Sequence, residues 1–300
     1  MKIFVVGDIT LDILCKTGNY AKPGEETGLE SLDFSLGGNA ANFAFAASKL
    51  GFKTELFSAI GNDFATSFLK KQLSSCGIKQ SLKKTALHNA CSVILVGKKG
   101  ERSIYSEKGA LETLSSKDIE KKLLPKLKHG NIVFFGAYFH LAKMHKGFPK
   151  LLKKIRKKGC AIAFDACFDT YGKWKVMHLL KCLDIFFLNE LELEHIAKTK
   201  NKSKAVKKLF SKGASIIVLK KGAKGSELFL PDFSVSVPAS KANAVDTTGA
   251  GDIFNAAFLY AFFSGASEKK SLEFANFMAG QKISKHGLFV PAGSVEILYK

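Results

Sequence analysis

The chain has 300 residues, of which 46% are hydrophobic and 24% are charged. This composition is typical of a globular protein whose core needs no disulfide or metal to stabilise it. The net charge of +20 comes almost entirely from lysine, because Arg102 and Arg156 are the only arginines. Nucleic-acid-binding proteins usually carry arginine and a concentrated basic stripe, whereas these lysines lie on segments with helical spacing, as on solvated helix faces.

The N-terminal apolar run is short and stops at Asp8, so it indicates a buried strand rather than a secretory leader. The longest apolar stretch, at residues 253–263, is interrupted by Asn255 and is too short to span a bilayer. None of the six cysteines forms a C-x-x-C pair, which argues against a structural zinc site. We therefore expect a cytoplasmic protein with reduced thiols.

Five short, almost continuously apolar runs predict strands of a parallel sheet covered on both faces. They are residues 3–6, 132–135, 161–164, 185–188 and 216–219. Apolar residues at helical spacing predict helices at residues 39–50, 64–75, 117–127, 146–157, 191–197, 202–211, 252–263 and 268–285. This alternation predicts a doubly wound α/β fold. No repeat or linker divides the chain, so residues 1–300 are expected to form one domain.

Two regions break the alternation of strands and helices. Residues 11–36 contain strand-like pieces without a helical pattern, and residues 87–110 contain a predicted hairpin whose turn is the segment GKKG at 97–100. Together they could form a small separate sheet that acts as a lid over a site.

A glycine-rich turn, the segment DTTGAGD at 246–252, leads directly into the apolar run at 253–263. The backbone N–H groups at such a helix start attract an anion, most often a phosphate. The carboxylate of Asp252 would repel that anion unless it had a task, such as removing the proton of a hydroxyl that attacks the phosphate. The alternative is an aspartate that caps the helix.

The segment GGNAAN at 37–42 is a second unusual cluster. Two glycines allow the backbone to approach a ligand closely. Asn39 and Asn42 lie about one turn apart on a helix otherwise filled by Ala and Phe, where their amides could bind polyol hydroxyls. The alternative is that Asn39 caps the helix and Asn42 is satisfied locally.

Other polar residues follow predicted strands, where ligands bind in open α/β sheets. Asp12 follows the first strand and could accept hydrogen bonds from hydroxyls or only form a turn. Asn189 and Glu192 follow the fourth strand and suit Mg²⁺, or else complement the start of a helix. Lys220 follows the fifth strand and could reach a phosphate, although the glycines after it also suit a hairpin turn.

Asp165 and Asp169 follow the third strand, and the sequence assigns them no role. Neither a G-x-x-x-x-G-K-[ST] loop nor a G-x-G-x-x-G fingerprint occurs, which excludes the commonest ATPases and dehydrogenases. The individual signals are weak, but five of them fall at strand ends that should share one edge of the sheet.

With these motifs the chain resembles the PfkB, or ribokinase-like, family of carbohydrate kinases over its whole length. The segments GGNAAN at 37–42, NELE at 189–192 and DTTGAGD at 246–252 match the family's motifs in order and separation. The resemblance implies a three-layer, mostly parallel α/β domain with a small β-sheet lid. It also implies ATP as phosphoryl donor, Mg²⁺ as cofactor, an alcohol as acceptor and a homodimer formed through the lid.

The resemblance further implies roles for individual residues. Asp252 would be the catalytic base, ionised at the helix start, beside an anion hole formed by Gly249, Ala250 and Gly251. Acceptor hydroxyls would be bound by Asp12, Gly38, Asn39 and Asn42. The nucleotide would lie along Lys220, Gly222, Gly225 and Asn276. Mg²⁺ and its waters would be organised by Asn189 and Glu192. In some members a monovalent cation such as K⁺ is held at the positions of Asp246 and Thr248.

We therefore expect an ATP-dependent kinase that phosphorylates a hydroxymethyl group of a small sugar. Some sugar-acid kinases of the family carry an Asn-x-Arg element where this chain has DACFDT at 165–170, which argues against a 2-keto-3-deoxygluconate kinase. The alternative is a nucleoside kinase, in which rings such as Phe34, Phe139 and Phe168 would clamp a base. A less favoured class is a non-catalytic sugar- or nucleic-acid-binding protein.

Overall fold

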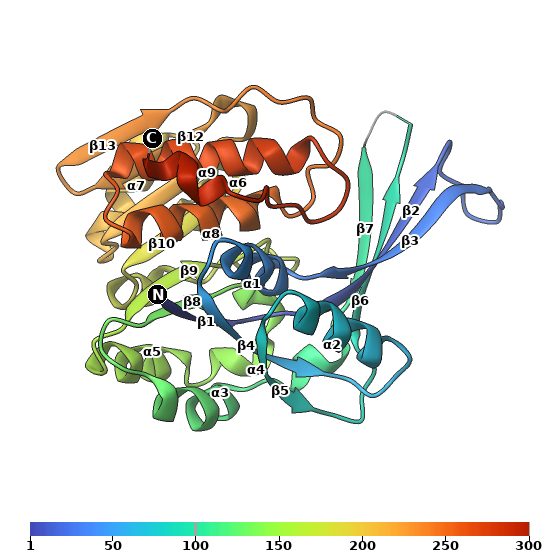
Figure 1. Ribbon diagram of the computed structural model, residues 1–300, viewed down its shortest axis with the longest axis horizontal. Helices are drawn as coiled ribbons and strands as arrows, with labels where there is room; N and C mark the ends of the chain where they lie inside the picture. The colour runs from blue at the N-terminus through green and yellow to red at the C-terminus, as the bar shows by residue number, and fades with distance from the viewer. Residues whose placement is uncertain (99–100, 300) are drawn as a thin grey trace.

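The computed structural model describes residues 1–98 and 101–299, which contain two separate sheets (Figure 1). The larger sheet has the strand order β13-β12-β11-β10-β9-β8-β1-β4-β5. From one edge to the other, its strands are β13 (Phe233–Val237), β12 (Ser226–Leu230), β11 (Ile216–Lys220), β10 (Ile185–Asn189), β9 (Ala161–Asp165), β8 (Ile132–Phe135), β1 (Lys2–Val6), β4 (Lys53–Ile60) and β5 (Lys79–Lys84). Pairing is parallel from β5 to β11 and antiparallel at β12 and β13.

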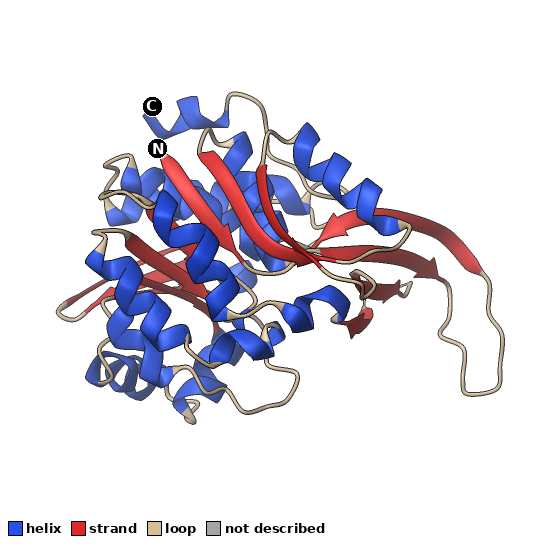
Figure 2. Cartoon of the chain, turned by 90° about the horizontal axis from the view of Figure 1, so that it is seen from below, coloured by secondary structure: helices blue, strands red, loops and turns tan. Residues whose placement is uncertain are grey.

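Helices cover both faces of this sheet, so the domain has three layers (Figure 2). One core lies between the sheet and α1 (Asn39–Lys49), α2 (Ala65–Ser75), α8 (Ala250–Phe263) and α9 (Glu268–Ile283). The other lies under α3 (Ser116–Leu123), α4 (Ala142–His145), α5 (Phe148–Lys157), α6 (Glu190–Ala197) and α7 (Lys202–Ser211). The central strand β1 serves both cores, because Ile3 and Val5 face the first and Phe4 and Val6 the second. The three-layer fold expected from the sequence is confirmed.

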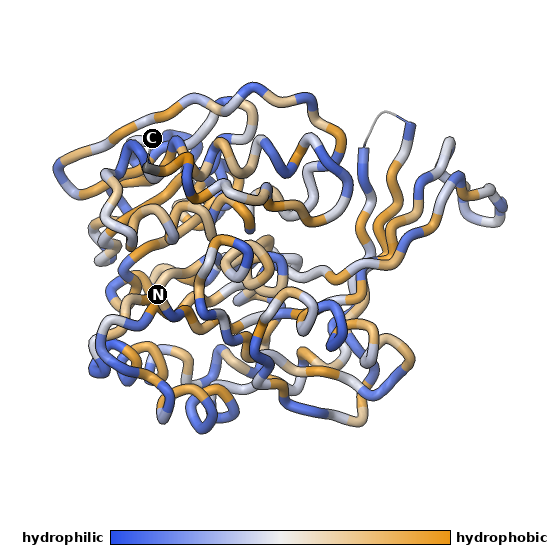
Figure 3. Tube along the Cα trace, viewed as in Figure 1, coloured by the Kyte–Doolittle hydropathy of each residue, from blue (hydrophilic) through white to orange (hydrophobic). Residues whose placement is uncertain are grey.

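The outer helices show the pattern that the lysine-rich segments predict. In α5, Leu151, Leu152 and Ile155 are buried, whereas the lysines between them face outward. Hydrophilic residues accordingly lie on the outside of these helices, and hydrophobic residues are concentrated in the strands (Figure 3). By contrast, α8 is buried over most of its length and packs against both α1 and α9.

The smaller sheet has the order β3-β2-β6-β7 and projects from one side of the larger sheet (Figure 1). Its strands are β2 (Thr10–Thr17), β3 (Leu29–Gly37), β6 (Ala90–Val96) and β7 (Arg102–Glu107). Residues 99 and 100 of the turn predicted between β6 and β7 lie outside the described residues. Because β2 leaves β1 after only three residues, this sheet stands next to the carboxyl end of the central strand.

The sequence patterns missed four strands of the larger sheet as core elements. β4 and β5 carry polar residues, which hid their apolar pattern. Glu55 in β4, for example, is buried, and it accepts hydrogen bonds from Lys126 and, at 2.7 Å, from Ser81. β11 and β12 form the hairpin that was one interpretation of the glycines after β11, and β13 pairs antiparallel with β12. The helix expected at 117–127 ends as α3 at Leu123, because Pro125 forms a 3₁₀ turn.

Candidate active site

Four polar side chains meet at the carboxyl edge of the larger sheet. Asp8 follows β1, and Asp165, Asn189 and Lys220 are the last residues of β9, β10 and β11. The register pairs Phe187 with Asp165 and Asn189 with Lys220, so these ends are adjacent. The N-termini of α1 and α8 reach the same edge, as the hydrogen bonds below show.

The Asp252 carboxylate is held by two asparagines of α1. Asn39 donates from Nδ2 to Oδ1 of Asp252, and Asn42 donates from Nδ2 to Oδ2 at 2.9 Å. The N-cap of α8 is Gly249 and the N-cap of α1 is Gly38, so the interpretation of Asp252 or Asn39 as a helix cap is wrong. The segments at 37–42 and 246–252 therefore form one site.

The helix start does not lower the pKa of Asp252 in the protein without ligands. Burial raises the pKa of Asp252 well above its ordinary value, and repulsion from Asp165 and Asp8 acts in the same direction. The hydrogen bond from Asn42 and the charge of Lys220 lower this pKa but do not reverse the shift. Asp252 is thus a proton acceptor whose affinity for a proton is increased by its surroundings.

Glycines at three positions make room for the site. A Cβ built at Gly37 would lie 2.1 Å from the carboxylate of Asp12. Gly38 has a φ of 99°, and its Cβ would lie 2.9 Å from the backbone oxygen of Asp8. Gly249 has a φ of 74°, a conformation that L-residues with a side chain rarely adopt. Glycine is therefore required where α1 and α8 begin.

A buried ion pair lies beside the start of α8. Lys220 Nζ is 2.7 Å from Oδ2 of Asp165, which also accepts a hydrogen bond of 2.7 Å from Asn255. A Cβ built at Gly251 would lie 3.6 Å from Lys220 Nζ. The Lys220 ammonium therefore lies next to the N-terminus of α8, where positive charge favours anion binding.

The NELE segment forms a capping box at the start of α6. Glu192 N–H donates to Asn189 Oδ1 and Asn189 N–H donates to Glu192 Oε2, both at 2.8 Å. Burial, followed by repulsion from Asp165, raises the pKa of Glu192 to about 7, although Lys220 opposes the shift. The interpretation of these residues as a helix start is therefore confirmed, and Glu192 also belongs to the charged cluster around Asp165.

These carboxylates suit Mg²⁺ bound through phosphates and water rather than in a protein cage. Within residues 1–98 and 101–299, no group of three His, Cys, Asp or Glu side chains could hold a metal ion. Mg²⁺ usually keeps several waters and takes only one or two carboxylates beside substrate phosphates. Glu192 and Asp165 provide hard oxygen donors of this kind next to Lys220.

Asp12 lies on β2 in the smaller sheet and is 8% exposed. Its Oδ1 accepts a hydrogen bond of 2.7 Å from Thr10. Burial raises the pKa of Asp12 to about 6, and repulsion from Asp8 adds to this effect. Since Asp8 interacts electrostatically with both Asp12 and Asp252, the smaller sheet contributes its carboxylate to the same region.

The residues expected along the nucleotide divide into two groups. Gly222, with a φ of 56°, faces open space after β11. Gly225 and Asn276 instead pack on the segment after β13: a Cβ at Gly225 would lie 2.1 Å from the Val237 oxygen, and Asn276 donates to the Pro238 oxygen at 3.1 Å. Their contacts explain why glycine and asparagine occur there without a ligand.

Sequence reasoning missed several residues of this cluster. Asp8 accepts the Ala40 N–H at 2.8 Å and thereby stabilises the start of α1. Asn255, the polar interruption in an apolar run, was a signal for a buried polar contact. Lys282 is fully buried against Asp246, but nothing distinguished it among so many lysines. Asp169, which had no assigned role, accepts backbone N–H groups of its own loop, including Trp174 at 2.6 Å.

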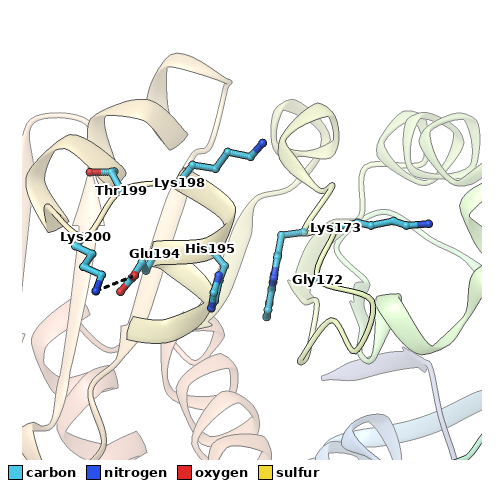
Figure 4. A pocket seen from close by; sticks show the side chains of 8 residues that line it. Gly172, Lys173, Glu194, His195, Lys198, Thr199 and Lys200 are labelled. Carbon is cyan, nitrogen blue, oxygen red and sulfur yellow. Dashed lines mark ion pairs between the residues drawn. The ribbon is translucent and has the colours of Figure 1, made fainter.

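A separate cavity of about 370 Å³ lies between the loop at Gly172–Trp174 and the C-terminal half of α6 (Figure 4). Lys173 borders it on one side and His195 on the other, and His195 stacks on Trp174 at 4.9 Å between ring centroids. None of the predicted site residues lines it. This cavity is therefore separate from the cluster around Asp252.

Together, the α/β fold and a carboxylate at a glycine-rich helix start are features of a kinase that phosphorylates a hydroxyl. The family model for pfkB family carbohydrate kinases matches residues 1–292. The chain therefore belongs to the pfkB family of carbohydrate kinases. Within the described residues, no helix is long and apolar enough to cross a membrane.

Two named relatives match over nearly their full length. The chain is 28% identical to a deoxyribokinase of Salmonella typhi over 288 residues, which cover 92% of each protein. It is also 28% identical to a nucleoside kinase of Methanothermobacter thermautotrophicus, covering 95% of this chain and 90% of the relative. A ribokinase of Thermotoga maritima has a similar structure, with a TM-score of 0.84, 25% identity and coverage of 100% of this chain and 99% of that chain.

Proposed function

We propose that the protein transfers the γ-phosphoryl group of ATP to a hydroxymethyl group of a small free sugar, most readily a pentose. The observation that carries this proposal is the Asp252 carboxylate, which lies in the third position of α8 and is bound by Asn39 and Asn42. The names of the relatives, deoxyribokinase and ribokinase, support a pentose as acceptor.

In the proposed reaction, the hydroxyl oxygen of the sugar forms a bond to the γ-phosphorus as the bond from that phosphorus to ADP breaks. Asp252 accepts the hydroxyl proton. The N–H groups at Gly249–Gly251 and the Lys220 ammonium stabilise the negative charge on the transferring group. Mg²⁺, when bound with ATP, supplies further charge neutralisation, and Glu192 and Asn189 would hold it through water. ATP as donor agrees with the cytoplasmic location expected from the sequence.

Substrate hydroxyls are proposed to contact Asp12, Asn39 and Asn42. The amide oxygens of Asn39 and Asn42 are buried and have no hydrogen-bond partner. A buried acceptor without a donor costs free energy, and a polyol hydroxyl supplies the missing donor. These orphaned oxygens beside Asp252 support an acceptor rich in hydroxyl groups.

The aromatic residues favour a sugar over a nucleoside. Phe139 is buried in the core against Trp174. Phe34 pairs with Ile13 in the smaller sheet, so it faces away from the side that carries Asp12. Of the three rings considered for a base clamp, Phe168 alone stays available: it is 51% exposed and makes an edge contact with Trp174 at 5.3 Å between ring centroids.

The proposal is tested by ATP consumption with Mg²⁺ against a panel of pentoses, hexoses and nucleosides, with the product position determined by NMR. We expect turnover with a free pentose and none with a nucleoside. Turnover with nucleosides alone would replace the proposed acceptor by a nucleoside, and binding of a sugar without any turnover would favour a non-catalytic sensor.

We also propose that the smaller sheet is a lid over the site and that two copies of the chain associate through it. The face of this sheet opposite Asp12 carries Phe34, Leu32 and Tyr105, which are 52%, 48% and 65% exposed. An exposed apolar patch of this kind is typical of an interaction surface. A second copy would cover it with the same patch, as two-fold dimers do.

A further inference from the structure

Lys282, in the last turn of α9, is a lysine whose side chain has 0% exposure. Its Nζ donates to Oδ2 of Asp246 at 2.7 Å, to the backbone oxygen of Asp246 at 2.9 Å and to the backbone oxygen of Lys285 at 3.3 Å. A protonated lysine has three N–H donors and a neutral amine has only two. Three oxygen acceptors around the nitrogen fit a buried ammonium ion. Burial lowers the pKa of Lys282 below its ordinary value, although the hydrogen bond and the charge of Asp246 oppose this shift.

The oxygens around Lys282 belong to the segment that leads into α8. Oδ1 of Asp246 accepts the Thr248 N–H at 2.9 Å, and Oδ2 accepts the Gly287 N–H at 3.2 Å. The backbone N–H of Asp246 donates to the Ile283 oxygen at 3.1 Å. Through these hydrogen bonds, Lys282 connects the end of α9 to the segment just before Gly249, where the proposed anion hole begins.

The monovalent cation expected at Asp246 and Thr248 does not fit these residues. The Asp246 carboxylate already has a cationic partner: burial raises its pKa, but the hydrogen bonds from Lys282 and Thr248 and the charge of Lys282 together keep the pKa below its ordinary value. The guanidinium of Arg102 donates to the hydroxyls of Thr247 and Thr248. A free cation at this position would face two fixed positive charges.

We propose that the Lys282 ammonium replaces the bound monovalent cation in this chain, so that the enzyme works without K⁺. Lys282 is then a positioning residue: its charge holds Asp246, and Asp246 holds the backbone that presents the N–H groups of Gly249–Gly251. The effect on turnover rests on the proposed kinase function. The effect on the fold of this segment does not, and it can be measured without any substrate.

The first experiment uses the wild-type enzyme. Turnover is compared in potassium chloride, ammonium chloride and tetramethylammonium chloride at equal ionic strength, because tetramethylammonium is too large to enter an oxygen cage. The expected rates are equal in the three salts. A saturable, severalfold activation by potassium would show that a free cation is still needed and would overturn the proposal.

The second experiment removes the positive charge of Lys282 in two ways. Lys282→Ala leaves a space that a small cation can enter, whereas Lys282→Met fills the space without charge. In tetramethylammonium chloride we expect both variants to lose roughly tenfold or more in turnover, since about 1.4 kcal/mol of lost transition-state stabilisation has this effect. Potassium or ammonium should restore Lys282→Ala and not Lys282→Met. Lys269→Ala, an exposed lysine on the same helix, is the matched control and should behave like the wild type.

Thermal unfolding separates this inference from the proposed function. Without ATP or sugar, Lys282→Ala should unfold at a lower temperature than Lys269→Ala in tetramethylammonium chloride and recover in potassium chloride. This result would support the proposal that the Lys282 ammonium replaces a bound cation, even if no acceptor were phosphorylated. Loss of stability in Lys282→Ala with no recovery in either small cation would reduce Lys282 to an ordinary buried ion pair. If neither Lys282 variant folds, the salt comparison on the wild type decides.

Discussion

The two asparagines of α1 control the Asp252 carboxylate at the scale of single residues. Each donates one N–H to a different oxygen of the carboxylate, and hydrogen bonds to the ionised form lower a carboxyl pKa. The hydrogen bond from Asn42 lowers the pKa of Asp252 against the larger effect of burial, which raises it. The side chain is therefore oriented by two bonds while it keeps a high affinity for a proton, which is the combination that a general base needs.

Replacing Asp252 by asparagine removes the proton acceptor but keeps the shape of the side chain. Turnover should fall by roughly 10²–10⁴-fold, the usual contribution of a general base. Binding of ATP and sugar, measured by calorimetry, should change little. In the wild type, turnover should rise with pH as Asp252 loses its proton. Near-normal turnover of Asp252→Asn would remove this residue from the mechanism.

Glu192 makes the stability of the protein depend on pH. Its pKa is raised from 4.5 to about 7, so the folded state binds this proton more tightly than the unfolded state. The resulting stabilisation is complete below the unfolded pKa and is lost as pH rises through the folded pKa. Glu192→Gln keeps an oxygen acceptor for the Asn189 N–H and removes the titration.

Between about pH 5 and about pH 8, the wild type should therefore lose roughly 1–3 kcal/mol of unfolding free energy relative to Glu192→Gln. Denaturant unfolding at a series of pH values measures this difference. Glu190→Gln, whose side chain is 51% exposed, is the control and should follow the wild type. Parallel curves for wild type and Glu192→Gln would contradict the raised pKa.

At the scale of elements, the side chain of Arg102 connects the smaller sheet to the segment that precedes α8. Arg102, at the start of β7, donates to the hydroxyls of Thr247 and Thr248. These contacts join two parts of the chain about 146 residues apart. A lid that excludes water limits hydrolysis of ATP without acceptor, so this contact is expected to stabilise the closed arrangement.

Arg102→Ala should weaken closure. We expect a severalfold higher KM for the sugar and a larger ratio of ATP hydrolysis to sugar phosphorylation, both measured by product analysis. Arg156→Ala is the matched control, because the second arginine pairs with Asp184 at 3.0 Å, just before β10 begins and thus at the opposite edge of the sheet. An unchanged ratio in Arg102→Ala would dissociate Arg102 from lid function.

For the whole molecule, the apolar face of the smaller sheet predicts a dimer. Phe34→Ser should convert a dimer into a monomer in light scattering coupled to size-exclusion chromatography. Phe233→Ser, on the edge strand β13 and equally 52% exposed, should leave the dimer intact. A wild-type protein that is monomeric at all concentrations would contradict association through this face.

The fold shows where the lysines that give the chain its positive charge are placed. Lysines occupy the outer faces of helices such as α5, and several pair with acids, for example Lys154 with Glu120 and Lys202 with Glu227. This distribution favours solvated faces over a nucleic-acid-binding stripe. No gel shift with duplex DNA is expected at physiological salt.

The sequence by itself determined the alternation of strands and helices, since five buried strands and the helix that follows the glycine-rich turn at 246–252 could be predicted from local patterns. It also placed Asn39, Asn42 and Asp252 in motifs whose glycines permit close approach. These features are local, because periodicity and turn conformation depend on neighbouring residues.

Only the tertiary structure decided which charged side chains lie next to one another. The raised pKa of Asp252, the burial of Glu55 in β4 and the ammonium of Lys282 against Asp246 depend on contacts between segments far apart in the chain. A lysine looks the same in sequence whether it is solvated or buried, because its environment is made by other elements. Burial and long-range pairing set the electrostatics of the site, and neither is encoded in a local pattern.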